Sequence, residues 1–259
     1  MRLTILIPIY NEAPVLERSV ERVRATAPPA GPGGEPMDRT IVLIDDGSTD
    51  GSAEIARRLA QRDGIDCVLR QRNAGKGRAI ADGLAAALEH GTDAAIIQDA
   101  DLEYDPADHA RVLEPIVTGQ ADAVIGSRFI GQTHRVLYYW HSVGNRALTT
   151  LSNMLSNLNL TDMECGTKAF SRPVLDRLRI TEPRFGVEPE IVAKLARMRL
   201  PDETRNETSD ETSSGRVRPL RIYEVPVRYA GRTYAEGKKI GWRDGFEALR
   251  CIAQHNLLG

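Results

Sequence analysis

Residues 94–103 read Ala-Ala-Ile-Ile-Gln-Asp-Ala-Asp-Leu-Glu, a short apolar run followed directly by a segment that carries two aspartates. The run suits a buried strand, and alternate residues of an extended chain point to the same side. We therefore expect Asp99 and Asp101 to face the same way where this strand ends. Two carboxylates one residue apart supply hard oxygen ligands, which suit Mg²⁺ or Mn²⁺ bridging to a diphosphate. Because aspartate is also common in solvated turns, the rest of the chain has to decide between these interpretations.

Strand and helix patterns alternate through the first half of the chain. Apolar runs and helical spacing predict strands at 3–9, 40–44, 67–69, 94–97 and 121–125, and helices at 13–24, 50–62, 76–89 and 107–117. Apolar strands without polar alternation, separated by helices, indicate a mostly parallel α/β sheet with helices on both faces. Ligands of such sheets bind beyond the carboxyl ends of the strands. The polar residues expected to converge on that crevice are Asn11, Asp45, Asp46, Asp99 and Asp101.

The second half of the chain is less regular. Its patterns predict helices at 138–158 and 187–199, a strand at 166–170, and regular structure again at 220–229. Two segments are expected to be flexible loops: 26–38, which is rich in Pro and Gly, and 201–219, which is dense in Glu, Asp, Thr and Ser.

The C-terminal segment 240–253 predicts an amphipathic helix. Trp242, Phe246, Leu249 and Ala253 fall on one face of it. Such a face either lies on a membrane surface or packs against the sheet or a second subunit, and the sequence leaves these alternatives open.

Composition and charge exclude several classes of protein. The 259 residues are enough for one large α/β domain or two small ones. A formal net charge of −2 argues against a nucleic-acid binder that relies on bulk attraction. Cys67, Cys165 and Cys251 are widely spaced without a CxxC pattern, so we expect reduced thiols in a cytoplasmic protein. Neither a signal peptide nor an apolar run of roughly 18 residues, as a bilayer span needs, is visible in the sequence.

Two loop motifs at strand ends add candidate ligand-binding groups. In the segment 45–51, DDGSTDG, Asp46 is placed to accept hydrogen bonds from a base or a ribose, and Asp50 to cap the next helix. The segment 73–77, NAGKG, opens a helix whose backbone N–H groups, together with Lys76, could meet a phosphate. It lacks the spacing of a Walker loop.

Several ordered motifs resemble those of the family 2 glycosyltransferases, which have the Rossmann-like GT-A fold. They are PIYNE (8–12), DDGSTD (45–50), NAGKG (73–77), DADLEYDP (99–106) and GSRF (126–129). Later segments look like the dolichyl- and polyprenyl-phosphate mannosyl- or glucosyltransferases: DMECGTKAF (162–170), RFGVEPEI (184–191), EVPVRY (224–229) and GRTYAEGKKIGWRDG (231–245). The resemblance implies a single GT-A domain, with 1–130 as its nucleotide-sugar-binding half and 131–259 as its acceptor-binding half.

The resemblance also implies roles for individual residues. Those that would bind the nucleotide sugar are Pro8, Tyr10, Glu12, Ile44, Asp46, Lys76, Asp99, Ala100, Asp101, Arg128, Arg232 and Lys238. Ile44 and Asp46 would flank the base and the ribose, and Arg128 would contact phosphate. Lys239 is the alternative to Lys238, because segment 236–239 differs from the Gly-Ser-Lys turn that is usual in the family.

The catalytic residues that the resemblance implies are Asp99, Asp101 and Arg128. Asp101 would be the principal ligand of Mg²⁺ or Mn²⁺, with Asp99 and Glu103 beside it. A divalent ion and basic side chains would stabilise the leaving diphosphate electrostatically. By the family's usual stereochemistry, the transfer would invert the anomeric centre.

A lipid phosphate acceptor limits the chemistry that is required. A phosphate monoester is already anionic near pH 7 and can attack the anomeric carbon without a strong general base. Should a base act, Asp162 and Glu164 lie near where other family 2 enzymes carry one, although helix capping or loop structure explains them as well. The candidate cations for the acceptor phosphate are His134, Arg135, Arg146 and Lys168, with a solvated basic face as the alternative.

The sequence therefore predicts a metal-dependent, inverting hexosyltransferase that acts on a polyprenyl or dolichyl phosphate. Mannose from GDP-mannose is the preferred transfer and glucose from UDP-glucose is the alternative. A glycosyltransferase with a soluble acceptor is the competing class. The expected partners are the nucleotide sugar, the lipid phosphate and the cytoplasmic face of a membrane, bound peripherally. Nucleic acid is not expected, and a homo-oligomer is left open.

Overall fold

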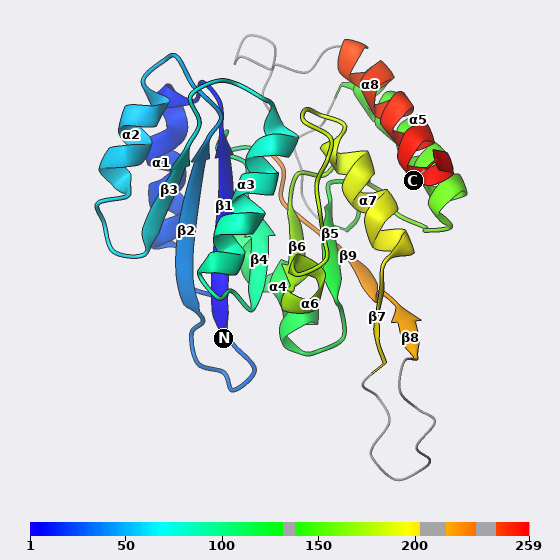
Figure 1. Cartoon of the computed structure of the whole chain (residues 1–259), viewed down its shortest axis with the longest axis horizontal. Helices are drawn as coiled ribbons and strands as arrows, with labels where there is room; N and C mark the ends of the chain where they lie inside the picture. The colour runs from blue at the N-terminus through cyan, green and yellow to red at the C-terminus, as the bar shows by residue number, and fades with distance from the viewer. Residues whose placement is uncertain (132–137, 203–215, 232–241, 259) are drawn as a thin grey trace.

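The computed structural model of the chain describes residues 1–131, 138–202, 216–231 and 242–258 (Figure 1). Its main sheet has the strand order β3-β2-β1-β4-β6-β5-β9. The strands are β1 (Arg2–Ile9), β2 (Asp38–Asp45), β3 (Ile65–Leu69), β4 (Ala94–Ile97), β5 (Ala123–Ser127), β6 (Lys168–Ser171) and β9 (Ile222–Pro226). Neighbouring strands pair in parallel except for β6, which runs antiparallel to both β4 and β5. The prediction of a mostly parallel α/β sheet is confirmed, and β6 is the strand that the parallel pattern does not predict.

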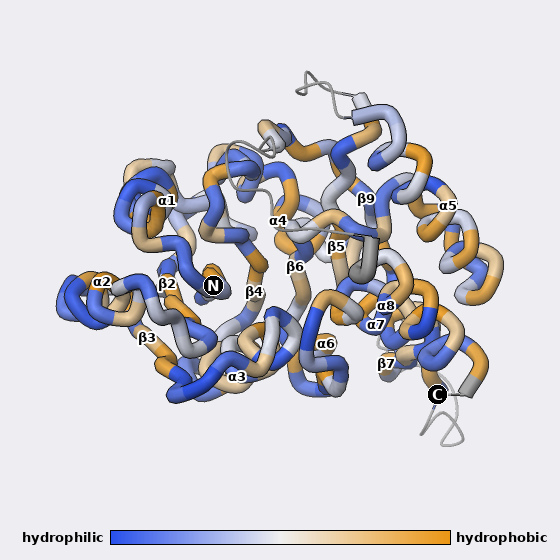
Figure 2. The backbone as a smooth tube through the Cα atoms, turned by 90° about the horizontal axis from the view of Figure 1, so that it is seen from above, coloured by the Kyte–Doolittle hydropathy of each residue, from blue (hydrophilic) through white to orange (hydrophobic). Residues whose placement is uncertain are grey.

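Helices cover both faces of the sheet. They are α1 (Ala13–Ala25), α2 (Ser52–Leu59), α3 (Lys76–Glu89), α4 (His109–Val117), α5 (Tyr139–Ser156), α6 (Arg172–Leu175), α7 (Val187–Arg197) and α8 (Trp242–Ala253), with a 3₁₀ turn at Pro106–Asp108 before α4 and a π-helical turn at Gln254–Leu258 after α8. Ile5 and Ile7 of β1 belong to the apolar core with α1, α2 and α4, whereas Leu6 belongs to the core with α3, α6 and α7. The period of two along an extended chain thus divides the core into two layers. Figure 2 shows the strands between α1 and α4 on one side and α3 and α6 on the other.

Asp50 ties two helices together at the edge where the strands end. Its carboxylate accepts hydrogen bonds from the backbone N–H of Ser52, at the start of α2, and of Ala13, at the start of α1, each at 3.0 Å. The first N–H groups of a helix have no partner within the helix, so one carboxylate stabilises two helix ends here. Asp50 thus accepts the first N–H of the next helix, although the N-cap residue itself is Gly51, and its bond to α1 was not predicted.

The loop predicted at 26–38 is present, but its C-terminal end is fixed at Met37 and Asp38. Its ends are held together by backbone hydrogen bonds from Gly31 to Glu35 at 2.7 Å and from Met37 to Pro29 at 2.9 Å. Met37 is buried in the core, and β2 begins at the next residue. An apolar side chain that docks in the core fixes a Pro- and Gly-rich segment that composition alone describes as loose.

The expected loop at 201–219 is shorter than the sequence suggests. Its ends belong to β7 (Arg199–Pro201) and β8 (Val217–Pro219), which pair antiparallel in a small second sheet. Residues 203–215 lie outside the described part of the chain.

The face of α8 that the sequence singles out points outward. Phe246 is 66% exposed and Leu249 is also exposed, whereas Ala248, Cys251 and Ile252 are buried against the protein. The alternative in which Phe246 and Leu249 pack on the sheet is therefore wrong. None of the described helices combines the length and the apolar character that crossing a bilayer requires.

Candidate active site

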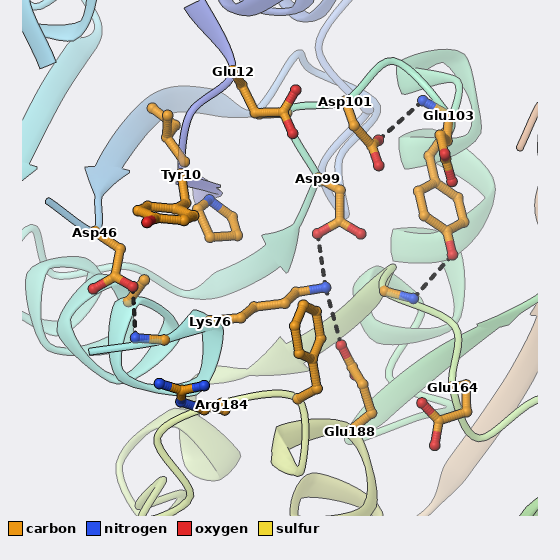
Figure 3. A pocket seen from close by; sticks show the side chains of 18 of the residues that line it. Tyr10, Glu12, Asp46, Lys76, Asp99, Asp101, Glu103, Glu164, Arg184 and Glu188 are labelled. Atoms are coloured by element: carbon orange, nitrogen blue, oxygen red, sulfur yellow. Dashed lines mark hydrogen bonds and ion pairs between the residues drawn. The ribbon is translucent and has the colours of Figure 1, made fainter. Parts of the chain in front are cut away.

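A cavity of about 350 Å³ lies at the carboxyl ends of β1, β2 and β4, where the topology predicts ligand binding. Many of its walls are residues that the sequence singles out. These are Pro8, Tyr10, Glu12, Asp46, Lys76, Asp99, Ala100, Asp101, Glu103 and Arg128. Figure 3 shows Tyr10 and Asp46 at one end of the pocket, Asp99 and Lys76 in the middle, and Glu164 at the other end.

Three of the predicted binding residues are not found in the cavity wall. Ile44 is fully buried in the core layer beneath α3, so its side chain does not reach the pocket. Arg232 and Lys238, together with the alternative Lys239, lie outside the described residues.

Asp46 holds the neighbouring loop in place. Its two carboxylate oxygens accept hydrogen bonds from Asn73 Nδ2 at 2.8 Å and from the backbone N–H groups of Ala74 at 2.9 Å and Gly75 at 2.6 Å. These bonds occupy two of the backbone N–H groups that the sequence suggested for a phosphate, those of Ala74 and Gly75. They give Asp46 a structural role that the sequence did not predict, in addition to the expected contact with a base or a ribose.

Lys76 lies between two carboxylates at the centre of the pocket. Its Nζ is 2.9 Å from Asp99 Oδ1 and 3.2 Å from Glu188 Oε1. Burial disfavours the charged amine, but Asp99 and Glu188 outweigh burial and raise the pKa of Lys76 above its ordinary value. Lys76 is therefore a fixed cation, and Glu188, from the predicted segment 184–191, is a pocket residue that the sequence analysis did not name.

Lys168 continues this row of charges into the protein interior. It is fully buried, forms an ion pair with Glu188, and donates to the carbonyl oxygens of Met163 and Cys165. Its proposed contact with an acceptor phosphate is wrong, because nothing outside the core can reach its amine. Of the other acceptor cations, Arg146 is exposed on α5, and His134 and Arg135 fall outside the described residues.

Asp99 and Asp101, which the sequence predicts to face the same way, both line the pocket. Asp101 Oδ1 accepts the backbone N–H of Glu103 at 3.1 Å across a turn in which Leu102 has φ of 66°. Positive φ is uncommon for a residue other than glycine and often marks a functional loop. Glu103 Oε2 in turn accepts the hydroxyl of Tyr229 at 2.6 Å.

Buried side chains support this loop from below. Gln98 Nε2 donates to the carbonyl oxygens of Asp99 at 3.2 Å and Tyr104 at 3.5 Å, while Gln98 Oε1 lies 2.7 Å from His109 Nε2. Burial lowers the pKa of His109 to about 4, so the ring is neutral near pH 7 and its Nε2–H donates to Gln98. The loop backbone is thereby held at both ends.

The residues present fit a divalent ion that is only partly coordinated by protein. In the described ranges, no three His, Cys, Asp or Glu side chains form a metal-binding group. Mg²⁺ and Mn²⁺ commonly take one or two carboxylates and complete their shell with substrate phosphates and water. Asp101 and Glu103 supply such oxygens, and Asp99 supplies another that is engaged by Lys76 in this structure.

Arg128 enters the pocket from the far side and is clamped by Asp162. Its Nε and Nη2 donate to the two oxygens of Asp162 at 2.6 and 2.7 Å, and Nη2 also reaches Asn145 of α5 at 3.2 Å. Because these bonds use Nε and Nη2, Nη1 is the nitrogen with which Arg128 can bind an anion. Asp162 is fully buried in this clamp, so the suggestion that it acts as a general base is wrong.

Glu164 is the acidic residue of the pocket that lacks a visible role. Its Oε1 is buried and accepts no hydrogen bond from any described residue. Burial, followed by the nearby Glu188 carboxylate, raises the pKa of Glu164 to about 7. Other residues of this wall come mostly from segments whose motifs the sequence indicates, although it gives these residues no individual role. They are Tyr104, Gly166, Arg184, Phe185 and Tyr229.

Comparison with known proteins shows the family of this chain. The model of the family described as Glycosyl transferase family 2 matches residues 4–179, which include every motif from PIYNE to DMECGTKAF. The chain belongs to glycosyl transferase family 2. It is therefore a glycosyltransferase.

Curated relatives of this family 2 glycosyltransferase include enzymes named for lipid phosphates. The UDP-N-acetylglucosamine–dolichyl-phosphate N-acetylglucosaminyltransferase of Methanococcus voltae is 27% identical over 208 residues, which are 73% of this chain and 79% of the relative. The undecaprenyl-phosphate mannosyltransferase of Micrococcus luteus is 28% identical over 252 residues, which are 93% of this chain and 88% of the relative.

A solved structure supports the GT-A fold of this glycosyltransferase. Glucosyl-3-phosphoglycerate synthase from Mycobacterium tuberculosis, in complex with Mn²⁺, UDP and glucosyl-3-phosphoglycerate, aligns with a TM-score of 0.65 at 20% identity. The alignment covers 98% of this chain and 80% of that protein. The prediction of a GT-A domain is confirmed.

We predict that Gly166→Ala disrupts the centre of the pocket. A methyl group on Gly166 would overlap Asp99 Oδ2 and stand 3.4 Å from Lys76 Nζ, so the ion pair between them has to shift. Overpacking of this kind costs roughly 1–3 kcal/mol of unfolding free energy. We expect that loss in urea denaturation, and a fall of at least about tenfold in affinity for GDP or UDP in calorimetry.

Gly144→Ala is the matched control for this change. A methyl group on Gly144 of α5 meets nothing within 4 Å, and alanine in a helix is more stable than glycine by roughly 0.5–1 kcal/mol. The control should keep nucleotide affinity and gain stability. Equal behaviour of the two variants would contradict the crowding at Gly166.

We also predict that Glu164 makes stability depend on pH. Its pKa rises from an ordinary 4.5 to about 7 on folding, so the native state holds a proton that the unfolded chain releases. Stability is therefore lost as pH rises from about 4.5 to 7. In urea titrations, Glu164→Gln should be more stable than wild type by up to about 3 kcal/mol at pH 8, with little difference near pH 4.5. A difference that is constant with pH would refute this account.

Proposed function

We propose that this glycosyltransferase moves a hexose, preferably mannose from GDP-mannose, to a polyprenyl or dolichyl phosphate with inversion of the anomeric centre. Glucose from UDP-glucose is the alternative donor. The preference for mannose is supported by the Micrococcus luteus relative, which is named a mannosyltransferase and spans nearly the whole chain. The relative from Methanococcus voltae is named for N-acetylglucosamine, so the donor is the part of this proposal that most needs experiment.

The observation that carries the lipid acceptor is an apolar surface beside the pocket. Tyr139 and Trp140 at the start of α5 are 72% and 76% exposed, and Phe246 and Leu249 are exposed on the neighbouring α8. Asn145 of the same α5 bonds to Arg128 in the pocket wall. Figure 1 shows α5 and α8 side by side at one end of the molecule.

The charge of α5 favours a membrane over water as the neighbour of this surface. The helix contains no Asp or Glu, and Arg146 is exposed on it. Tyrosine and tryptophan favour the boundary between lipid and water. We propose that the α5–α8 surface lies peripherally on the cytoplasmic face of a membrane, where it would bring the pocket to a lipid phosphate.

The residues of the pocket suit the proposed transfer. A divalent ion bound at Asp101, with Glu103 and Asp99 beside it, would supply positive charge for the leaving diphosphate. Arg128 Nη1 would donate to a phosphate oxygen, and Lys76 keeps a fixed positive charge beside Asp99. The acceptor phosphate oxygen attacks the anomeric carbon as the bond to the diphosphate oxygen breaks, and a monoester dianion needs no base for this step.

We predict that nucleotide binding identifies the donor and depends on Asp101. In thermal-shift titrations with GDP, UDP, GDP-mannose and UDP-glucose, ligand at about a hundred times its dissociation constant adds roughly 2.7 kcal/mol of stability. We expect a Mn²⁺-dependent shift with one base only. Asp101→Asn, whose amide oxygen can still accept from Glu103 N–H, should keep its fold, lose the Mn²⁺ dependence and lower turnover at least about 100-fold. Undiminished Mn²⁺ dependence in this variant would remove Asp101 as the principal ligand.

We predict that the α5–α8 surface is needed for transfer to a lipid in a bilayer. The double variant Tyr139→Ser, Trp140→Ser should sediment less with vesicles of anionic and neutral phospholipids that contain undecaprenyl phosphate. Its transfer rate to that lipid should fall at least about tenfold, with donor affinity unchanged.

Val217→Ser is the control for this surface, because Val217 is exposed on β8, away from α5 and α8. It should behave as wild type in both assays. Two outcomes would favour the soluble-acceptor alternative. In the first, the double variant also behaves as wild type. In the second, no lipid product forms and vesicles leave the turnover of a water-soluble acceptor unchanged.

A further inference from the structure

We propose that Glu164 binds a hydroxyl group of the transferred sugar and thereby helps to set which sugar the pocket accepts. This inference deepens the proposed function and rests on its nucleotide-sugar donor, but it does not depend on the identity of the acceptor. Glu164 would act as a specificity-determining residue in the part of the pocket that the nucleotide does not fill.

The position of Glu164 along the pocket indicates which part of the donor it meets. Tyr10 and Asp46 stand at one end, the Asp99–Asp101 pair lies in the middle, and Glu164 stands at the end opposite Asp46 (Figure 3). A nucleotide sugar carries its diphosphate between nucleoside and sugar. With the nucleoside towards Tyr10 and the diphosphate along the aspartates, the sugar has to extend towards Glu164.

The chemistry of Glu164 calls for a partner that the described protein does not supply. Oε1 is buried without a hydrogen bond from the described residues, and such atoms in native pockets are matched by water or ligand. The two nearest cations are already engaged, because Lys168 is held by Glu188 and two carbonyl oxygens, and Arg128 is clamped by Asp162. Glu164 as a whole is partly exposed and lines the cavity, so a sugar hydroxyl can donate to its other carboxylate oxygen, Oε2.

The backbone on both sides of Glu164 is fixed, so the point from which its side chain enters the pocket is set before a ligand arrives. Met163 N–H donates to Thr149 Oγ1 at 3.2 Å, and Gly166 N–H donates to the Tyr104 hydroxyl at 3.1 Å. Lys168 binds the carbonyl oxygens of Met163 and Cys165 from within the core. A preorganised polar group of this kind discriminates between ligands more strongly than a mobile one.

The charges around Glu164 also suit hydroxyl recognition. Burial and then the Glu188 carboxylate raise the pKa of Glu164, whereas the Lys168 and Arg128 cations lower it. A carboxyl group that titrates near pH 7 offers an acceptor oxygen in both protonation states and an O–H donor when protonated. It can therefore pair with a hydroxyl both below and above its pKa.

The test compares each nucleotide sugar with its own nucleoside diphosphate. Calorimetry with Mn²⁺ gives the ratio of the two dissociation constants for GDP-mannose and GDP, and for UDP-glucose and UDP. Glu164→Ala should weaken the nucleotide sugar about tenfold and leave the diphosphate within twofold. Glu164→Gln, which keeps an acceptor oxygen, should recover most of the loss. Glu114→Ala, on the exposed face of α4, is the matched control and should change neither constant.

Monodeoxy analogues of the donor sugar then identify the hydroxyl. Wild type should bind one analogue about tenfold more weakly than the parent donor, and Glu164→Ala should bind that analogue and the parent equally. An unchanged ratio of sugar nucleotide to diphosphate in Glu164→Ala would overturn the inference. An equal loss for both ligands would overturn it as well, because that result indicates a structural role.

Failure of the proposed function has a different signature. If the enzyme uses another acceptor, no polyprenyl-phosphate product forms, but the ratio of dissociation constants still responds to Glu164 as described.

Discussion

The pocket depends on a row of alternating charges, Asp99, Lys76, Glu188 and Lys168, that links four elements of the sheet and its helices. Asp99 follows β4, Lys76 begins α3, Glu188 lies in α7 and Lys168 begins β6. Removing one partner from a buried ion pair leaves an uncompensated charge, which typically costs about 3–5 kcal/mol. The two halves of the chain are therefore joined by ion pairs at the centre of the candidate site.

The fold and the centre of the site could be predicted because their signals are local. Apolar runs mark the strands, and the carboxyl ends of parallel strands meet at one edge, so Asp99 and Asp101 could be placed together from their positions alone. The partners of these residues could not. The sequence shows only that Lys168 and Asp162 carry charges. The folded chain shows that both are buried, in ion pairs with Glu188 and Arg128 respectively. The hydrogen bonds of Asp46 could not be predicted for the same reason, since its donors in the segment 73–75 come from another loop.

A short chain of hydrogen bonds connects the pocket to α5. Arg128 is clamped by Asp162, and Asn145 bonds to both of them from α5. The aromatic residues Tyr139 and Trp140 lie on that same helix. A shift of α5 on its proposed membrane surface would move Asn145 and so change the hydrogen bonds of the Arg128 guanidinium group, without any rearrangement of the sheet.

The direction of β6 decides which loops can reach the ligand. Its neighbours β4 and β5 send the residues that follow them to the pocket edge, but β6 runs the other way and sends the residues that precede it. Glu164 and Gly166 reach the pocket for that reason. The part of the pocket that Glu164 and Gly166 line is thus encoded in a different stretch of chain from the aspartates after β4. A substitution at Glu164 can therefore reshape one end of the pocket and leave the aspartates after β4 in place.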